Sequence, residues 1–126
     1  MTFELSPPFR MMVHCHCSRC RKSSGIGHAT NLVAEPTPLR WLSGEADITC
    51  YLPTARSFGK WFCHRCGCPL LRLTRDGALV VIPGGSLDEE PAITPTDHIF
   101  WSSRVAWACP SDELPTHAGY PAAWRR

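Results

Sequence analysis

Hydrophobic residues in this chain form short runs rather than the spacing of an amphipathic helix. Twelve prolines interrupt the sequence. Because proline removes a backbone donor and clashes with the preceding turn, most of the intervals are too short for a helix of average length. The runs between these breaks are apolar or alternate between apolar and polar residues, which is typical of β-strands. The predicted strands are residues 3–5, 11–14, 29–34, 39–42, 48–52, 60–62, 70–73, 79–82 and 98–101.

Glycine-containing turns separate the later strands. The segment 75–78, Arg-Asp-Gly-Ala, carries the Asp-Gly pair of a tight hairpin, and Pro-Gly-Gly-Ser at 83–86 marks a broader loop. We therefore predict a mainly β fold made of several small antiparallel sheets. No low-complexity stretch or linker divides the sequence, which favours a single domain over residues 1–126.

Composition excludes some classes of protein. A hydrophobic content of 44% argues against disorder, and a net charge of +2 gives no electrostatic footprint of a nucleic-acid binder. The first ten residues lack the features of a signal peptide, and no window approaches the ~18 uninterrupted apolar residues of a membrane span. We expect a soluble, cytoplasmic protein with neither a nucleic-acid nor a membrane partner.

Cysteine is unusually frequent, with eight residues in 126. In a reducing compartment, cysteines at short spacings are better interpreted as metal ligands or reactive groups than as disulfides. Six of them fall into two groups, Cys-His-Cys-Ser-Arg-Cys at 15–20 and Cys-His-Arg-Cys-Gly-Cys at 63–68.

The second group contains a zinc-knuckle pattern. Cys63 and Cys66 are spaced to supply two neighbouring ligands of a tetrahedral zinc site from one tight turn, and Gly67 suits the positive φ that the chain often needs on leaving such a turn. The alternative is a pair of half-buried free cysteines that act as small hydrophobic residues.

The first group offers three thiols within six residues. Cys15, Cys17 and Cys20 could fill three corners of a tetrahedron and leave the fourth open, as in catalytic zinc sites. The alternative is a structural site whose fourth ligand comes from elsewhere in the chain. In an extended segment the side chain of His16 points away from its neighbours, so we interpret it as a neighbour of the site and not as a ligand.

Four segments together resemble one known family. The sequence of 14–25 (His-Cys-His-Cys-Ser-Arg-Cys-Arg-Lys-Ser-Ser-Gly), that of 61–70 (Trp-Phe-Cys-His-Arg-Cys-Gly-Cys-Pro-Leu), Gly-Ser-Leu-Asp at 85–88 and the region 98–107 are similar to the glutathione-dependent formaldehyde-activating enzymes. This family is also called the centromere-protein-V-like domain family. The resemblance covers nearly the whole chain and implies an Mss4-like fold of coiled β-sheets.

The resemblance also implies a set of metal ligands. Cys15, Cys17 and Cys20 would bind the catalytic zinc, and Cys63 and Cys66 would form half of a structural zinc site. The family's other half is a Gly-x-Cys-x-Cys-Gly segment before the first strand, which this chain lacks.

Two explanations for the missing segment stay open. In the first explanation, which we favour, Met1 is an internal start of a longer reading frame. In the second, Cys63 and Cys66 recruit another ligand from Cys68, Cys50, Cys109 or a nearby histidine. Under the first explanation, this chain holds the catalytic zinc more reliably than the structural one, because two thiolates supply only part of the coordination free energy.

The implied activity is that of a zinc-dependent carbon–sulfur lyase acting on the adduct of a thiol such as glutathione with a small aldehyde, as in S-hydroxymethylglutathione synthase. Arg21 and Lys22 follow the third ligand and are candidates for binding the carboxylates of glutathione. The equally favoured alternative is that both are solvent-exposed basic residues without a binding role. The competing functions are a non-catalytic zinc-binding or interaction module and, less favoured, a thiol redox protein using Cys63 and Cys66.

Four further residues receive structural predictions. We expect Cys50 and Cys109 to be buried and not to bind metal, unless one of them completes the second zinc site. For Trp101 and Trp107 we favour the hydrophobic core over a pocket wall.

Overall fold

A five-stranded sheet forms the centre of the computed structural model, which describes residues 1–36, 39–53, 59–108 and 117–118. Its strand order is β7-β8-β3-β2-β9, and all neighbours are antiparallel except β2 and β9, which are parallel. The bounds are Phe9–Cys15 for β2, Ala29–Ala34 for β3, Arg72–Leu73 for β7, Val80–Pro83 for β8 and Asp97–Ile99 for β9.

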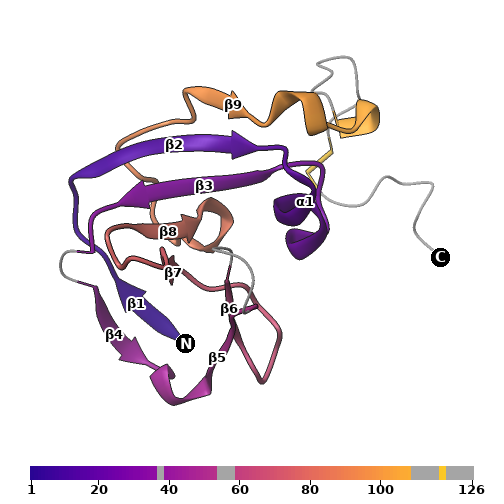
Figure 1. Ribbon diagram of the computed structural model, residues 1–126. Helices are drawn as coiled ribbons and strands as arrows, with labels where there is room; N and C mark the ends of the chain where they lie inside the picture. The colour runs from indigo at the N-terminus through magenta and orange to yellow at the C-terminus, as the bar shows by residue number, and fades with distance from the viewer. Residues whose placement is uncertain (37–38, 54–58, 109–116, 119–126) are drawn as a thin grey trace.

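Two ribbons of two strands each lie on one side of this sheet (Figure 1). One pairs β1 with β4, and the other pairs β5 with β6, both antiparallel. Their bounds are Thr2–Glu4, Arg40–Ser43, Ile48–Tyr51 and Lys60–Cys63. One α-helix, α1 (Ser18–Ser24), follows β2, and short 3₁₀ turns span Glu45–Asp47, Gly84–Ser86, Trp101–Ser103 and Ala106–Ala108.

Alternation along the strands divides the central sheet into two faces. Met12, Leu32 and Ile82 stand opposite one another across β2, β3 and β8 and are buried. They form a core with Ala34, Leu71 and Val80, against which the β1–β4 ribbon packs Phe3 and Trp41. Because side chains alternate between faces, the neighbours of these residues in sequence point to the opposite face. That second face carries the candidate site.

The predicted fold class is confirmed: the structure is mainly β, with several small sheets. The predicted hairpin joins β7 to β8, and Gly77 in its turn has a φ of +70°. Its loop is wider than a two-residue turn, because the N–H of Thr74 bonds to the carbonyl oxygen of Leu79 at 2.8 Å. Helix α1 was not predicted from the sequence. Among the described residues, none of the helices has the length and hydrophobicity that a membrane-spanning helix needs.

Candidate metal centre

Three cysteines meet where β2 ends and α1 begins. Cys15 is the last residue of β2, Cys17 caps the N-terminus of α1, and Cys20 lies in the first turn of the helix. Cys17 has an extended backbone (φ −60°, ψ 149°), and its Sγ accepts a hydrogen bond from the backbone N–H of Cys20 at 3.3 Å. As a result, the three Sγ atoms all lie within 4.8 Å of one another.

The short helix is fixed at both ends. At its C-terminus, Gly25 adopts a left-handed conformation (φ 71°), and its N–H donates to the carbonyl oxygen of Arg21 at 2.8 Å. At its N-terminus a thiol takes the capping role usually filled by a hydroxyl or carboxylate oxygen. The helix therefore presents Cys17 and Cys20 in a defined geometry beside Cys15.

The thiols differ in acidity. Burial raises the pKa of the Cys20 thiol, and hydrogen bonds from this thiol to Cys17 and Cys15 raise it further. Burial also raises the pKa of Cys15. Burial opposes ionisation of Cys17 too. However, the backbone N–H and the thiol of Cys20 both donate hydrogen bonds to the sulfur of Cys17, and the pKa of Cys17 is lowered below its usual value. Cys17 is thus the first thiolate of the cluster.

The donor set fits a thiophilic metal ion. Zinc bound by thiolates at about 2.3 Å in a tetrahedron places the sulfurs about 3.8 Å apart. Since no Sγ pair is separated by more than 4.8 Å, an inward shift of at most about 1 Å would complete that geometry. Among the described residues, Cys15, Cys17 and Cys20 are the one group of three or more potential ligands gathered this closely. No fourth potential ligand from the described residues joins these three sulfurs within 4.8 Å.

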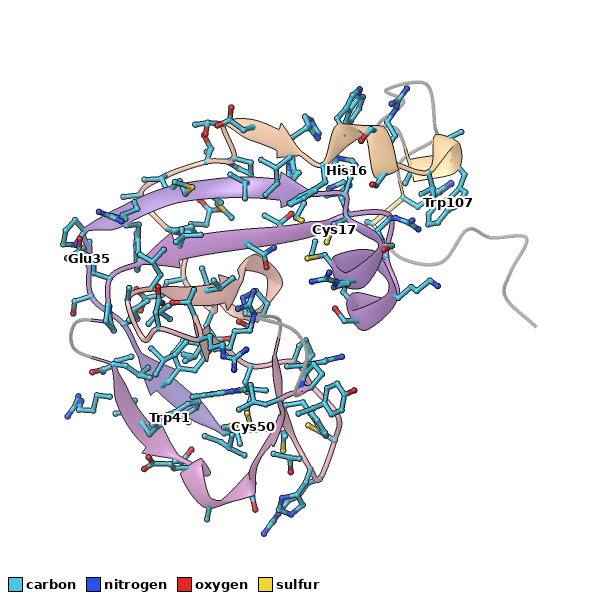
Figure 2. The ribbon with its side chains drawn as sticks, in the orientation of Figure 1. His16, Cys17, Glu35, Trp41, Cys50 and Trp107 are labelled. Atoms are coloured by element: carbon cyan, nitrogen blue, oxygen red, sulfur yellow. The ribbon has the colours of Figure 1, made fainter. Side chains whose placement is uncertain are left out.

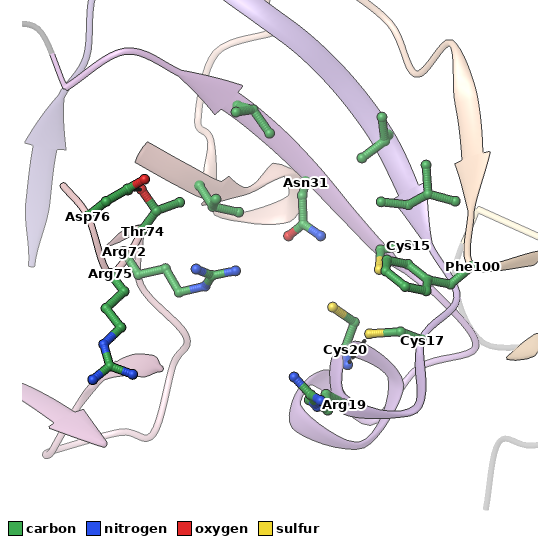
Figure 3. A pocket seen from close by; sticks show the side chains of 14 residues that line it. Cys15, Cys17, Arg19, Cys20, Asn31, Arg72, Thr74, Arg75, Asp76 and Phe100 are labelled. Carbon is green, nitrogen blue, oxygen red and sulfur yellow. Dashed lines mark hydrogen bonds between the residues drawn. The ribbon is translucent and has the colours of Figure 1, made fainter. Parts of the chain in front are cut away.

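The cluster opens onto a cavity of about 590 Å³ on the second face of the sheet (Figure 3). Figure 3 shows Cys17 and Cys20 directed into this space from α1, opposite Arg72. Its apolar walls come from Val13, Val33, Val81, Ile99 and Phe100. Its charged lining consists of Arg19, Arg72, Arg75 and Asp76. A second cavity of about 380 Å³ shares Cys20, Asn31 and Arg72 with the first.

Arg21 and Lys22, the predicted substrate-binding residues, do not line either cavity. The Nε of Arg21 instead donates to the carbonyl oxygen of His16, between two of the cysteines, at 3.2 Å. Lys22 is exposed on the helix. The carboxylate-binding role predicted for them therefore stays untested, and the guanidinium groups that do line the cavity were not singled out from the sequence.

Behind the cysteines lies a histidine cluster formed by His14, His16, His28 and His98. His16 is 1% exposed and points to the face opposite Cys15 and Cys17, as the alternation predicts; its Nε2 lies 2.8 Å from Nδ1 of His98. Ring centroids within the cluster are 4.4 to 6.3 Å apart. His16 therefore supports the turn between Cys15 and Cys17 and is not part of the sulfur cluster.

The predictions for the two tryptophans need correction. Trp101 packs edge-on against His16 with centroids 4.9 Å apart, but it is 43% exposed. Trp107 is 75% exposed and projects from the surface (Figure 2). Neither belongs to the core, because the short turns that carry them lie over the edge of the sheet and not beneath it.

The predicted knuckle forms at the end of β6. The N–H of Gly67 closes the turn on the carbonyl oxygen of Cys63 at 2.8 Å, and the φ of Gly67 is +74°, as the sequence suggested. Cys63 is buried and Cys66 is exposed. Within the described part of the chain no third ligand joins them within 4.8 Å, Cys68 included. Their role as half of a structural zinc site therefore stays a prediction.

The two isolated cysteines differ in what the structure says of them. Cys50 is exposed on β5, so the prediction that it is buried is wrong: its strand belongs to a two-stranded ribbon whose end, with Cys50 and Tyr51, is exposed (Figure 2). Cys109 lies outside the described residues.

The fold and the site define a mainly β protein in which three cysteines that could hold a metal ion lie beside an open cavity. Residues 1–103 match the family described as glutathione-dependent formaldehyde-activating enzyme, and the chain belongs to this family. A comparison with curated proteins found no match. Among solved structures, a Rhodobacter sphaeroides protein determined by crystallography in a structural genomics programme matches with a TM-score of 0.56 and 23% identity. That match covers 75% of this chain and 86% of the other, and it supports the fold alone.

Proposed function

We propose that this protein binds zinc through Cys15, Cys17 and Cys20 and uses the open position to add a glutathione-type thiol to formaldehyde. The observation that carries the proposal is the convergence of three Sγ atoms within 4.8 Å at the mouth of a cavity of about 590 Å³. Membership of the formaldehyde-activating family supports the choice of substrates.

The reaction joins the two substrates without loss of atoms. The sulfur of the thiol attacks the carbonyl carbon and forms the new C–S bond, the π electrons move to the carbonyl oxygen, and that oxygen gains a proton while the thiol loses one. The product is an S-hydroxymethyl thioether, and the reverse reaction is a carbon–sulfur lyase reaction. Bound zinc would supply a position at which a thiol is deprotonated near neutral pH.

The chain's own residues would prepare this position. The donors around Cys17 favour its thiolate form, which metal binding requires. Val13, Ile99 and Phe100 form an apolar wall of the cavity beside the cysteines, against which the carbon atoms of a bound thiol would pack. The guanidinium groups on the other side of the cavity attract an anionic thiol.

A two-part experiment tests this function against a non-catalytic role. Native mass spectrometry first counts zinc in the wild-type chain and in Cys17→Ser, and exchange NMR then measures the rate at which formaldehyde and glutathione interconvert with their adduct. We expect the wild type to accelerate exchange and Cys17→Ser to lose both zinc and acceleration. Zinc bound at Cys15, Cys17 and Cys20 without any acceleration would reject the enzymatic role and leave a binding module.

A further inference from the structure

Arg72 occupies the border between the two cavities. It belongs to β7 and stands opposite Val81 of β8, so its side chain shares the cavity face of the sheet. It lines both spaces, together with Cys20 and Asn31. A ligand that extends from the cysteine cluster into the second cavity would therefore lie beside this guanidinium.

Arg72 also differs from the other arginines of the cavity in its burial. Arg19 and Arg75 are exposed, whereas Arg72 is half-buried between the buried Leu71 and the edge of the cavity. Burial lowers the pKa of Arg72. Because its guanidinium is half-buried, salt screens the attraction of Arg72 for an anionic ligand less than it screens that of the two exposed arginines.

We propose that Arg72 is the specificity-determining residue that selects a carboxylate-bearing, peptide-like thiol over a neutral one. This inference rests on the proposed function, because it places the sulfur of the thiol at the cysteine cluster. A carboxylate near that sulfur meets the planar guanidinium, which can donate two parallel hydrogen bonds. The body of the thiol then continues into the second cavity, past Lys60 and Trp61.

The size and lining of the two cavities favour such a ligand. Volumes of about 590 and 380 Å³ exceed what a two- or three-carbon thiol needs, and together they suit a molecule of a few residues. The second cavity adds hydroxyl groups from Ser23, Ser24 and Ser86. These hydroxyl groups donate to the carbonyl oxygens of Cys20 and Pro83, so their oxygens can accept hydrogen bonds from the amide N–H groups of a peptide.

The test compares thiols that differ in charge. Dissociation constants of glutathione, 3-mercaptopropionate and the neutral 2-mercaptoethanol are measured by titration calorimetry on the zinc-loaded wild type, Arg72→Met and Arg72→Lys. Arg10→Met is the matched control, because it removes the same charge from an exposed residue paired with Glu35 and does not line either cavity.

We expect Arg72→Met to weaken binding of both anionic thiols roughly 10- to 100-fold while leaving 2-mercaptoethanol within about twofold. Arg72→Lys keeps the charge without the planar pair of donors and should fall between. Arg10→Met should match the wild type. An unchanged ratio of anionic to neutral affinity in Arg72→Met would overturn the inference while leaving the proposed function intact. A wild type that binds none of the three thiols would reject the proposed function and Arg72's role with it.

Discussion

Replacement of Arg21 by methionine tests whether this residue supports the metal site or binds substrate. The structure shows the Nε of Arg21 donating to the carbonyl oxygen of His16, which holds the backbone between Cys15 and Cys17. A hydrogen bond from a charged donor contributes roughly 1.5 to 3 kcal/mol to stability. We take about 1.5 kcal/mol here, because the contact between Arg21 and His16 is only part-buried. Loss of a residue that orients metal ligands typically weakens metal affinity by about 10- to 100-fold.

The assay separates the two roles. Zinc affinity is measured by competition with a chromophoric chelator, and the KM for glutathione is measured on protein saturated with zinc. We expect Arg21→Met to lose zinc affinity by about 10- to 100-fold with little change in KM. Lys22→Met, the exposed neighbour with the same charge change, should keep both values. A raised KM with unchanged zinc affinity would refute the supporting role and restore Arg21 as a substrate contact.

Three other substitutions give expected outcomes. Cys20→Ser should reduce zinc affinity by roughly 100- to 1000-fold, if a binding free energy of about 10–16 kcal/mol is shared among four ligands. Chelator competition with Cys50→Ser, an exposed cysteine outside the cluster, as control should show that the effect is specific to the cluster. Leu32→Ala, at a position 0% exposed in the core, should lower the free energy of unfolding by about 3–5 kcal/mol in urea denaturation; a loss under 1 kcal/mol would contradict the assigned core. Phe100→Gly should remove the strain of the left-handed backbone at this residue (φ 55°) and so raise the free energy of unfolding by about 1 kcal/mol. It should also raise the KM for the thiol, because Phe100 lines the cavity. A lower melting temperature with an unchanged KM would count against a role of Phe100 in the cavity wall.

The strands, and the convergence of three cysteines, could be predicted from the sequence for physical reasons. Alternation along residues 29–34 matches β3 at both ends, because one face of that strand is buried and the pattern records it. The same alternation placed His16 opposite its cysteine neighbours. Close spacing of Cys15, Cys17 and Cys20 brings their sulfurs together through local structure alone.

Other features depend on contacts that no local pattern records. Helix α1 has seven residues and begins at a thiol cap, so it offers neither periodicity nor a usual capping residue. Arg72 lies in an apolar run, Leu-Leu-Arg-Leu, and only the pairing of β7 with β8 brings it to the cavity. Trp101 and Trp107 were expected inside because of their size, but their exposure is set by where the turns after β9 lie.

Sulfur coordination of zinc, measured by X-ray absorption with and without glutathione, tests the central claim most directly. We predict three sulfur ligands at about 2.3 Å and one lighter atom in the protein alone, and four sulfur ligands after glutathione is added. The Cys17→Ser variant should not reproduce this change. Four protein sulfurs that remain unaltered by glutathione would contradict an open site and, with it, the proposed reaction.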